Sequence, residues 1–453
     1  MTGYLDAVAE FATETSFENL PVSIVDRTKL IITDTVAAIV GGAAEPEIRA
    51  LAQRLCIPGG GSAAIIGMGR RADPGVAALL NGSAGTFLEM DEGNQFCKGH
   101  PGMHTIPACY AWAEGRSVTG AEIITAIAVG YDVCARVGIA TNLRPAMHPH
   151  GTWGAIGAAV AIGRLAGFDA DKMKTLLNIS SNMCLASSRP TMLEGGTVRN
   201  MYTGISGQLG LLAYNLVEAG FTGERDGIQN VFGRIVSDSF ASDLMTEQLG
   251  TRWEVGRNYF KLHSCCRFNH AALDALEIIV ERHQQVREIG KIAEIKVRTY
   301  NLAAELNNQN PKNTLAAKFS LPFAIATTLI NGSTGVDSFT WDAVRNNAIQ
   351  DLAMKVVVSE DTSMSSKLPD ARPAAVVVTM TDGTVLQADT ETNRGDWRDP
   401  YSAAELHGKY TNLTARLWER KFSEAIYTEI MNLEKSTSLA SLENLISEAD
   451  QSP

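Results

Sequence analysis

The sequence predicts a mainly α-helical protein, in which a large all-helical domain is joined to a smaller α+β domain. Two observations support this fold class. Through about residue 260, apolar residues recur three and four positions apart, as they do on amphipathic helices, and beyond about residue 290 they form short strand-like runs. The chain has 453 residues, which is longer than a single hydrophobic core usually extends, so two domains are expected.

The helical pattern begins at the N-terminus, where acidic residues at helical spacing predict an amphipathic opening helix. Thr119 and Glu122 fit a capping box at the start of a long apolar helix. The glycine-rich stretch 151–167 matches neither the Rossmann nor the P-loop pattern, so we interpret it as a helix that packs closely against its neighbours. The clearest helical segments are 27–40, 76–90, 121–137 and 204–219.

The smaller domain is predicted from alternating and β-branched segments. We expect strands at 292–300, 352–361, 374–383 and 384–392, and helices at 314–331 and 341–350. Asp382-Gly383 predicts a hairpin between the last two strands. Helical periodicity returns after about residue 401, and we expect this tail to pack on the first domain. The predicted domains are therefore 1–265 with 400–453, all-helical and discontinuous, and 266–399, an α+β lid.

Composition restricts the partners and the compartment. The formal net charge of −11 argues against nucleic acid or an anionic membrane as a partner, because both are bound through clustered Lys and Arg. We predict no transmembrane segment and no signal peptide. Seven scattered cysteines without a CxxC motif favour a reducing compartment, and we expect the cytoplasm. An anionic small molecule would need a local cationic pocket in this acidic protein.

Six of the eight histidines fall in three short windows, 89–108, 144–154 and 258–275, together with Asp, Lys and Arg. Three interpretations arise: a metal site, histidines with structural roles only, or an acid/base site in which His, Lys and Asp move protons while Arg and Lys hold carboxylates. We favour the third and predict no metal, because no closed ligand pattern such as HExxH is present. A nucleophilic Cys265 or Cys266 and a pyridoxal phosphate on Lys261 are both disfavoured.

The same windows carry a family resemblance. Asp91 is followed by HPG (100–102) and IPA (106–108), and then come HPxGTxGAxGAA (148–159), YFKxxxxCRxxHxAxDA (259–275) and AKFSLPFAIA (317–326). In this order and spacing the chain resembles the MmgE/PrpD family, which includes 2-methylcitrate dehydratase and cis-aconitate decarboxylase. The resemblance implies a helical domain, an α+β lid, a site in the cleft between them and a homodimer.

The resemblance and the residue chemistry together assign roles. Asp91, His100, His148 and Lys261 fall on positions similar to the family's catalytic ones. Tyr202 is a further candidate base. We expect Arg199, Arg267, Lys98 and His263 to bind a small anionic di- or tricarboxylate, and we expect no cofactor.

Two departures from the family pattern bear on the reaction. Dehydratase-like members typically show two adjacent aspartates where this chain has Asp91-Glu92, and a Lys where it has Arg199. An arginine holds a carboxylate well but is not a proton donor of tunable pKa. The chain is therefore similar to the epimerase branch, and the expected reaction is cofactor-independent inversion of a stereocentre next to a carboxylate of a small aminodicarboxylate such as iminodisuccinate. The alternatives are a dehydratase, a C–O lyase on 2-methylcitrate or a related tricarboxylate, and a non-catalytic ligand-binding protein.

Overall fold

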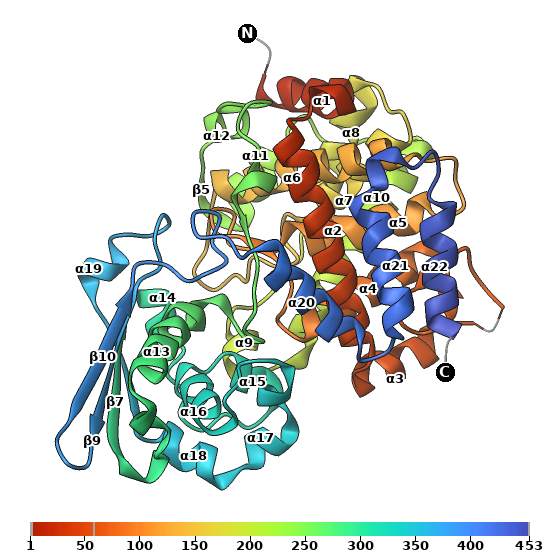
Figure 1. Cartoon of the computed structure of the whole chain (residues 1–453). Helices are drawn as coiled ribbons and strands as arrows, with labels where there is room; N and C mark the ends of the chain where they lie inside the picture. Colours follow the sequence, from red (N-terminus) through yellow and green to blue (C-terminus); the bar gives the residue numbers. More distant parts are fainter. Residues whose placement is uncertain (1–2, 58, 452–453) are drawn as a thin grey trace.

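A computed structural model describes residues 3–57 and 59–451. It shows a large helical body beside a smaller α+β unit, which confirms the predicted fold class (Figure 1). The helical body includes α1 (Tyr4–Glu14), α2 (Val22–Ala43), α3 (Pro46–Leu55), α4 (Pro74–Phe87), α5 (Pro101–Ala113), α6 (Gly120–Ala140), α7 (Gly154–Leu165), α8 (Ala170–Ser181), α9 (Pro190–Glu194), α10 (Tyr202–Glu218), α11 (Gly227–Asn230) and α12 (Asp243–Thr246). Three further helices come from the chain's end: α20 (Ala403–Thr414), α21 (Arg420–Met431) and α22 (Ala440–Gln451).

The C-terminal helices pack against the N-terminal part of the chain, and Figure 1 shows α20 and α21 beside α2. Their apolar side chains, such as Leu406, Trp418 and Ile446, belong to the hydrophobic core of the helical body. The tail from about residue 401 therefore packs on the first domain, as the sequence predicts. The domain boundaries at 265 and 400 remain predictions.

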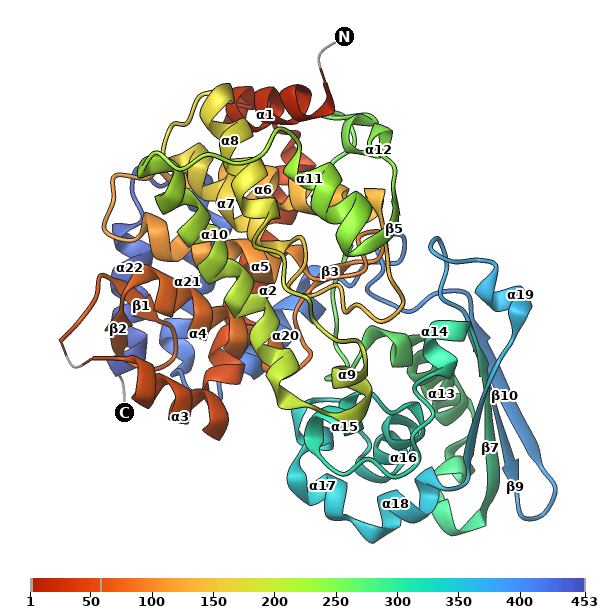
Figure 2. The same ribbon diagram turned by 180° about the vertical axis from the view of Figure 1, so that it is seen from behind.

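A four-stranded sheet forms the outer layer of the α+β unit. Its strand order is β10-β9-β7-β8, with β7 and β8 parallel and the other pairs antiparallel. Helices cover one face of the sheet, as both views show (Figures 1 and 2). The elements are α13 (His270–Arg282), β7 (Ile292–Thr299), α14 (Asn301–Ala304), α15 (Thr314–Lys318), α16 (Leu321–Asn331), α17 (Trp341–Arg345), α18 (Asn347–Ala353), β8 (Val356–Glu360), α19 (Thr362–Ser365), β9 (Ala374–Met380) and β10 (Val385–Thr390).

The α+β unit has its own hydrophobic core, separate from that of the helical body. It contains residues from α13 through β10, and also Met192 of α9. Because α9 lies between α8 and α10 in sequence, the chain leaves the helical body briefly to contact the second core, where α9 lies near α15 (Figure 2). Residues 190–194 therefore connect the two units.

Local predictions are confirmed at several elements. The Thr119 and Glu122 side chains form the capping box of α6. The hairpin joins β9 and β10, and Gly383 has the left-handed φ of +88° that favours glycine in this turn.

All seven cysteines lie in the described part of the chain, and none forms a disulfide there. The long apolar helix α6 would satisfy a membrane-span test by length and composition, but 94% of its apolar window is buried inside the helical body.

Four predicted segments need correction. The predicted helix 341–350 is divided at Asn346 into α17 and α18, since Asn346 caps a new helix. The segment 76–90 is helical only to Phe87, because Glu89 adopts a left-handed φ of +56° that no α-helix contains. The predicted helix 314–331 is divided at Phe319 and Ser320 into α15 and α16, since Ser320 caps a new helix. The predicted strand 352–361 begins only at Val356, after the end of α18.

Close helix packing is confirmed at the glycine-rich stretch. A Cβ added at Gly154 of α7 would lie 2.3 Å from the His104 ring, and one at Gly157 would lie 2.7 Å from Cys134 Sγ.

Two short antiparallel ribbons connect loops across the helical body: β3 (Gly93–Asn94) with β6 (Asn258–Tyr259), and β4 (Thr141–Leu143) with β5 (Ser237–Phe240). A third ribbon pairs β1 (Ala63–Ile65) with β2 (Arg70–Ala72) at the outer edge of the helical body (Figure 2).

Replacing Gly204→Ala in α10 should destabilise the protein, because the new Cβ would lie 2.0 Å from the backbone oxygen of Leu79 in α4. Overpacking of this kind typically costs about 1–3 kcal/mol. The matched control is Gly408→Ala in α20, where no atom lies within 4 Å of the added Cβ, so this variant should be neutral or more stable. Urea unfolding of both variants measures the difference, and equal stability would contradict the expected clash.

Candidate active site

The ribbon of β3 and β6 brings two predicted windows together. Gly93 pairs with Tyr259, and Asn94 with Asn258. A Cβ at Gly93 would lie 2.4 Å from Tyr259 Oη, so this approach requires glycine. The pairing places Asp91 and His100 beside Lys261, although they are about 160 residues away along the chain.

A cavity of about 220 Å³ lies at this junction, between the helical body and the α+β unit. Six of the nine residues assigned from the sequence line it: Lys98, His100, His148, Arg199, Lys261 and Arg267. Asp91 lies directly behind the wall, in contact with both His100 and Lys261.

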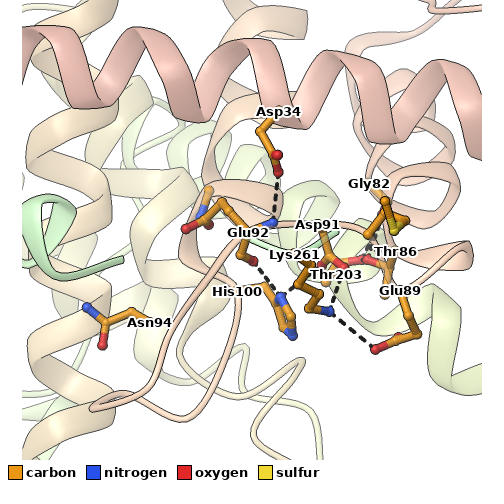
Figure 3. A network of polar contacts seen from close by, with 12 residues as sticks. Asp34, Gly82, Thr86, Glu89, Asp91, Glu92, Asn94, His100, Thr203 and Lys261 are labelled. Carbon is orange, nitrogen blue, oxygen red and sulfur yellow. Dashed lines mark hydrogen bonds and ion pairs between the residues drawn. The ribbon is translucent and has the colours of Figure 1, made fainter. Parts of the chain in front are cut away.

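Lys261 is buried between two carboxylates (Figure 3). Its Nζ lies 3.5 Å from Asp91 Oδ1 and 3.5 Å from Glu89 Oε2. Burial by itself lowers the pKa of Lys261, but the charges of Asp91 and Glu89 outweigh it and raise the pKa above its ordinary value. Lys261 is therefore an ammonium group at neutral pH, able to donate a hydrogen bond or a proton but not to accept one.

His100 presents an unprotonated nitrogen to the cavity. Its Nδ1 lies 2.5 Å from the Glu92 backbone oxygen, and because a carbonyl only accepts, Nδ1 carries the proton. The Asp91 carboxylate is 3.1 Å from the same nitrogen. Burial, assisted by the charge of Lys261, keeps the pKa of His100 well below its ordinary value. In this neutral tautomer Nε2 has a free lone pair, so His100 is suited to act as a base.

His148 has the opposite tautomer. The His150 backbone N–H donates to His148 Nδ1 at 3.0 Å, so the proton of the neutral ring lies on Nε2. Burial, and then the charge of Arg199, holds the pKa of His148 well below its usual range. An imidazolium at this position would lose the bond from His150. His148 is therefore a neutral hydrogen-bond donor rather than a base.

Arg199 forms a buried ion pair with Glu89, which also contacts Lys261. Both side chains of the pair are almost inaccessible to solvent. Sequence reasoning missed Glu89 because it is included in the predicted helix 76–90. Its spacing to Asp91 was the available signal: the two acidic residues lie two positions apart, directly after the uncharged stretch 74–88.

Besides Asp91, two assigned residues do not line the cavity. Tyr202 lies behind His148, with ring centroids 5.8 Å apart, and its hydroxyl is 3.4 Å from Thr191 Oγ1. His263 points toward the α+β unit, where its ring nitrogens contact Thr334 and Asp274. Tyr202 packs against the His148 ring, and His263 has protein partners at both nitrogens. The roles of Tyr202 as a base and of His263 as a substrate ligand remain predictions.

The cavity wall is strongly cationic. Seven Lys and Arg side chains line it against one carboxylate, Glu89. Besides those predicted, they are Arg144, which belongs to the second histidine window but was given no role, and Arg189 and Arg372, which sequence reasoning missed. This is the local cationic pocket that an acidic protein needs in order to bind an anion, and it favours a ligand with several negative charges.

The turn that carries Glu89 and Asp91 is held from behind by a second buried ion pair. Lys409 of α20 lies 2.5 Å from Asp34 of α2 and also donates to the Met90 backbone oxygen. Asp34 accepts the Glu92 backbone N–H at 2.9 Å. Helix α20, through Lys409 and its partner Asp34, thus fixes the backbone on either side of Asp91.

Replacing Lys409→Met should destabilise the helical domain by about 3–5 kcal/mol, because it leaves the Asp34 carboxylate buried without its cation. Urea unfolding provides the measurement. The double variant Asp34→Asn/Lys409→Met removes both charges and should regain a large part of the loss. A single variant as stable as the parent protein would contradict the proposed role of this pair.

The histidine tautomers can be tested by nitrogen NMR of labelled, ligand-free protein. Because the pKa values of both rings are lowered, we expect His100 and His148 to remain neutral at pH 6, with protons on Nδ1 and Nε2 respectively. His100→Gln and His148→Gln identify the two signals. In urea-unfolded protein every histidine should instead titrate near its ordinary value of about 6.5. An imidazolium signal for either residue in the folded protein at pH 6 would refute the assignment.

Comparison with known proteins places this site in a family. Residues 6–241 match the model of the MmgE/PrpD N-terminal domain, and residues 263–435 match that of the C-terminal domain. A cis-aconitate decarboxylase from Aspergillus terreus is 22% identical over 100% of this chain and 97% of its own length. A cis-aconitate decarboxylase-like protein, oryM, from Aspergillus oryzae is 23% identical over 97% of this chain and 96% of its own. The cis-aconitate decarboxylase of Mus musculus is 22% identical over 80% of this chain and 76% of its own. The chain belongs to the MmgE/PrpD family and is an enzyme.

Proposed function

We propose that this enzyme removes a proton from the carbon next to a carboxylate of a small polycarboxylate and returns a proton to it. The observation that supports this reaction is the pairing of His100, a neutral base, with Lys261, a protonated acid, in one cationic cavity. Proton abstraction at this carbon produces an enediolate, and the cavity supplies the positive charge and the donors that such an intermediate needs.

In this mechanism His100 Nε2 takes the α-proton. The Lys261 ammonium and the neutral His148 N–H donate to the oxygens on which negative charge develops. Asp91 lies 3.1 Å from His100 Nδ1 and stabilises the imidazolium as it forms. Glu89 holds Arg199, so that this guanidinium presents a fixed charge to the substrate.

Within this chemistry we place epimerisation first. Return of the proton to the opposite face requires a base and an acid at the same time, and His100 with Lys261 forms such a pair. Arg199 supports the choice, because it stands where dehydratase-like members carry a lysine and cannot protonate a leaving hydroxyl. Iminodisuccinate fits the charge of the site: each half is an aminodicarboxylate, and its four carboxylates match a wall of several cations.

A lyase is the second candidate, and the relatives favour it. Three of them, matched over most or all of the chain, are named for decarboxylation of cis-aconitate. Decarboxylation and dehydration of a tricarboxylate pass through a related carbanion, so the same base, acid and cations would serve. The two candidates differ in what happens to the carbanion after it forms.

Proton NMR in deuterated water separates the candidates. With iminodisuccinate, an epimerase exchanges the methine proton for deuterium and interconverts the stereoisomers. With cis-aconitate, a lyase instead releases carbon dioxide and produces new vinyl signals. With 2-methylcitrate it removes water, and the methyl doublet becomes the singlet of a methyl group on a double bond. If none of these acids exchanges a proton or forms a product, the proposal fails.

Lys261→Arg tests the acid in the same assay. Arginine keeps the positive charge between Asp91 and Glu89, so the fold and substrate binding should survive, but its planar, delocalised guanidinium does not give up a proton in proteins. We expect turnover to fall by about 10²–10⁴-fold, the usual contribution of a general acid or base. His100→Gln should cause a loss of similar size. Wild-type turnover by Lys261→Arg would show that Lys261 acts only as a charge.

A further inference from the structure

We propose that Arg372 of the α+β unit, together with Lys98 of the helical body, binds a second carboxylate of the substrate, remote from the reacting carbon. This inference rests on the proposed function and names the feature that selects polycarboxylates. Neither a sequence motif nor the family resemblance pointed to Arg372, which lies in the loop just before β9.

Arg372 is a buried cation without an anion. Its side chain is 5% exposed and forms part of the cavity wall. Within residues 3–57 and 59–451, its Nε and Nη1 have no hydrogen-bond partner, and Nη2 makes only a 3.5 Å contact with the Gln95 backbone oxygen. Keeping a guanidinium away from water without a partner is costly, and a ligand carboxylate would remove that cost.

The other buried arginines of the cavity already have ion-pair or hydrogen-bond partners within the protein. Arg199 is paired with Glu89. Arg267 donates from Nε to Asn393, from Nη1 to Gln95 and from Nη2 to Asp396. Arg267 therefore holds the domain junction together, and Arg372 beside it is the buried guanidinium whose charge the described residues leave uncompensated.

Lys98 is the second cation of this proposed carboxylate site. It lies in the loop after β3, lines the same cavity, and forms no ion pair with the described residues. Lys98 is an exposed residue and Arg372 a buried one, and both line the same cavity. Partial burial of the ammonium, and to a smaller extent the charge of Arg372, lowers the pKa of Lys98. A carboxylate between them would neutralise both charges and link the two structural units.

The aromatic neighbours of Arg372 fix the plane of its guanidinium. The group lies 5.3 Å from the centroid of Phe268 and 5.7 Å from that of Tyr300. A guanidinium held in this way is prepared for two-point binding of a carboxylate, which a lysine cannot provide. Arg144, like Lys98, is exposed where it lines the cavity, so the buried Arg372 gains more than either from a ligand carboxylate.

The test measures binding, so it does not depend on turnover. Isothermal titration calorimetry of the full chain with tricarballylate, a non-reacting tricarboxylate, compares wild type with Arg372→Gln and Arg372→Lys. We expect Arg372→Gln to weaken binding by at least about tenfold, as for a lost charged hydrogen bond, and Arg372→Lys to weaken it less. The matched control is Arg298→Gln, the same change of charge on the exposed face of β7, which should bind as wild type does.

Thermal unfolding without ligand distinguishes binding from structure. Because Arg372 has no anionic partner in the described chain, Arg372→Gln should unfold at or above the wild-type temperature. The inference is overturned if wild type does not bind tricarballylate, if Arg372→Gln binds within about twofold of wild type, or if it unfolds more than about 5 °C lower. Arg372-dependent binding without turnover of any acid would retain this inference while refuting the proposed function.

Discussion

The site depends on a chain of four buried charges. Arg199, Glu89, Lys261 and Asp91 alternate in sign, and each contacts the next. Removing one member of such a set leaves its neighbour charged and dehydrated, which usually costs several kcal/mol. The cluster is close to neutral as a whole. It therefore fixes the positions of Lys261 and Arg199, while in the proposed reaction the remaining cations of the wall meet the substrate's own charge.

Keeping these charges in place explains features far from the cavity. Glu89 and Asp91 lie on a turn with a left-handed residue, and β3 holds the following segment against β6. Lys409 holds the back of the turn from α20, more than 300 residues away in the chain. The C-terminal helices are thus part of the site's support, which gives a physical reason for the return of the chain to the helical body after the α+β unit (Figure 1).

The sequence predicted the parts of this site that local pattern can reveal. The histidine windows and the helical and strand periodicities led to the cavity and to six of its lining residues. Glu89 was missed because apolar spacing continued past the end of α4, and only its pairing with Arg199, 110 residues away, explains the turn. His263 shares a window with Lys261, but two residues further on its ring turns away from the cavity toward Asp274, which the local pattern could not show. Arg372 has no local signal, since its role depends on the absence of a partner in the folded chain.

The histidines show why a cationic cavity suits carbanion chemistry. Burial, and then the positive charges nearby, lower the pKa of both imidazoles, so His100 stays unprotonated and His148 stays a neutral donor, as the proposed reaction of an anionic substrate requires. The bond from the His150 backbone reinforces this state at His148, because it occupies the nitrogen that a second proton would need. The same cations that bind the carboxylates therefore keep the base free and lower the energy of the enediolate. What separates an epimerase from a lyase is then the group that meets the opposite face of that intermediate, and Arg199, fixed by Glu89, cannot act there as a proton donor to a leaving group.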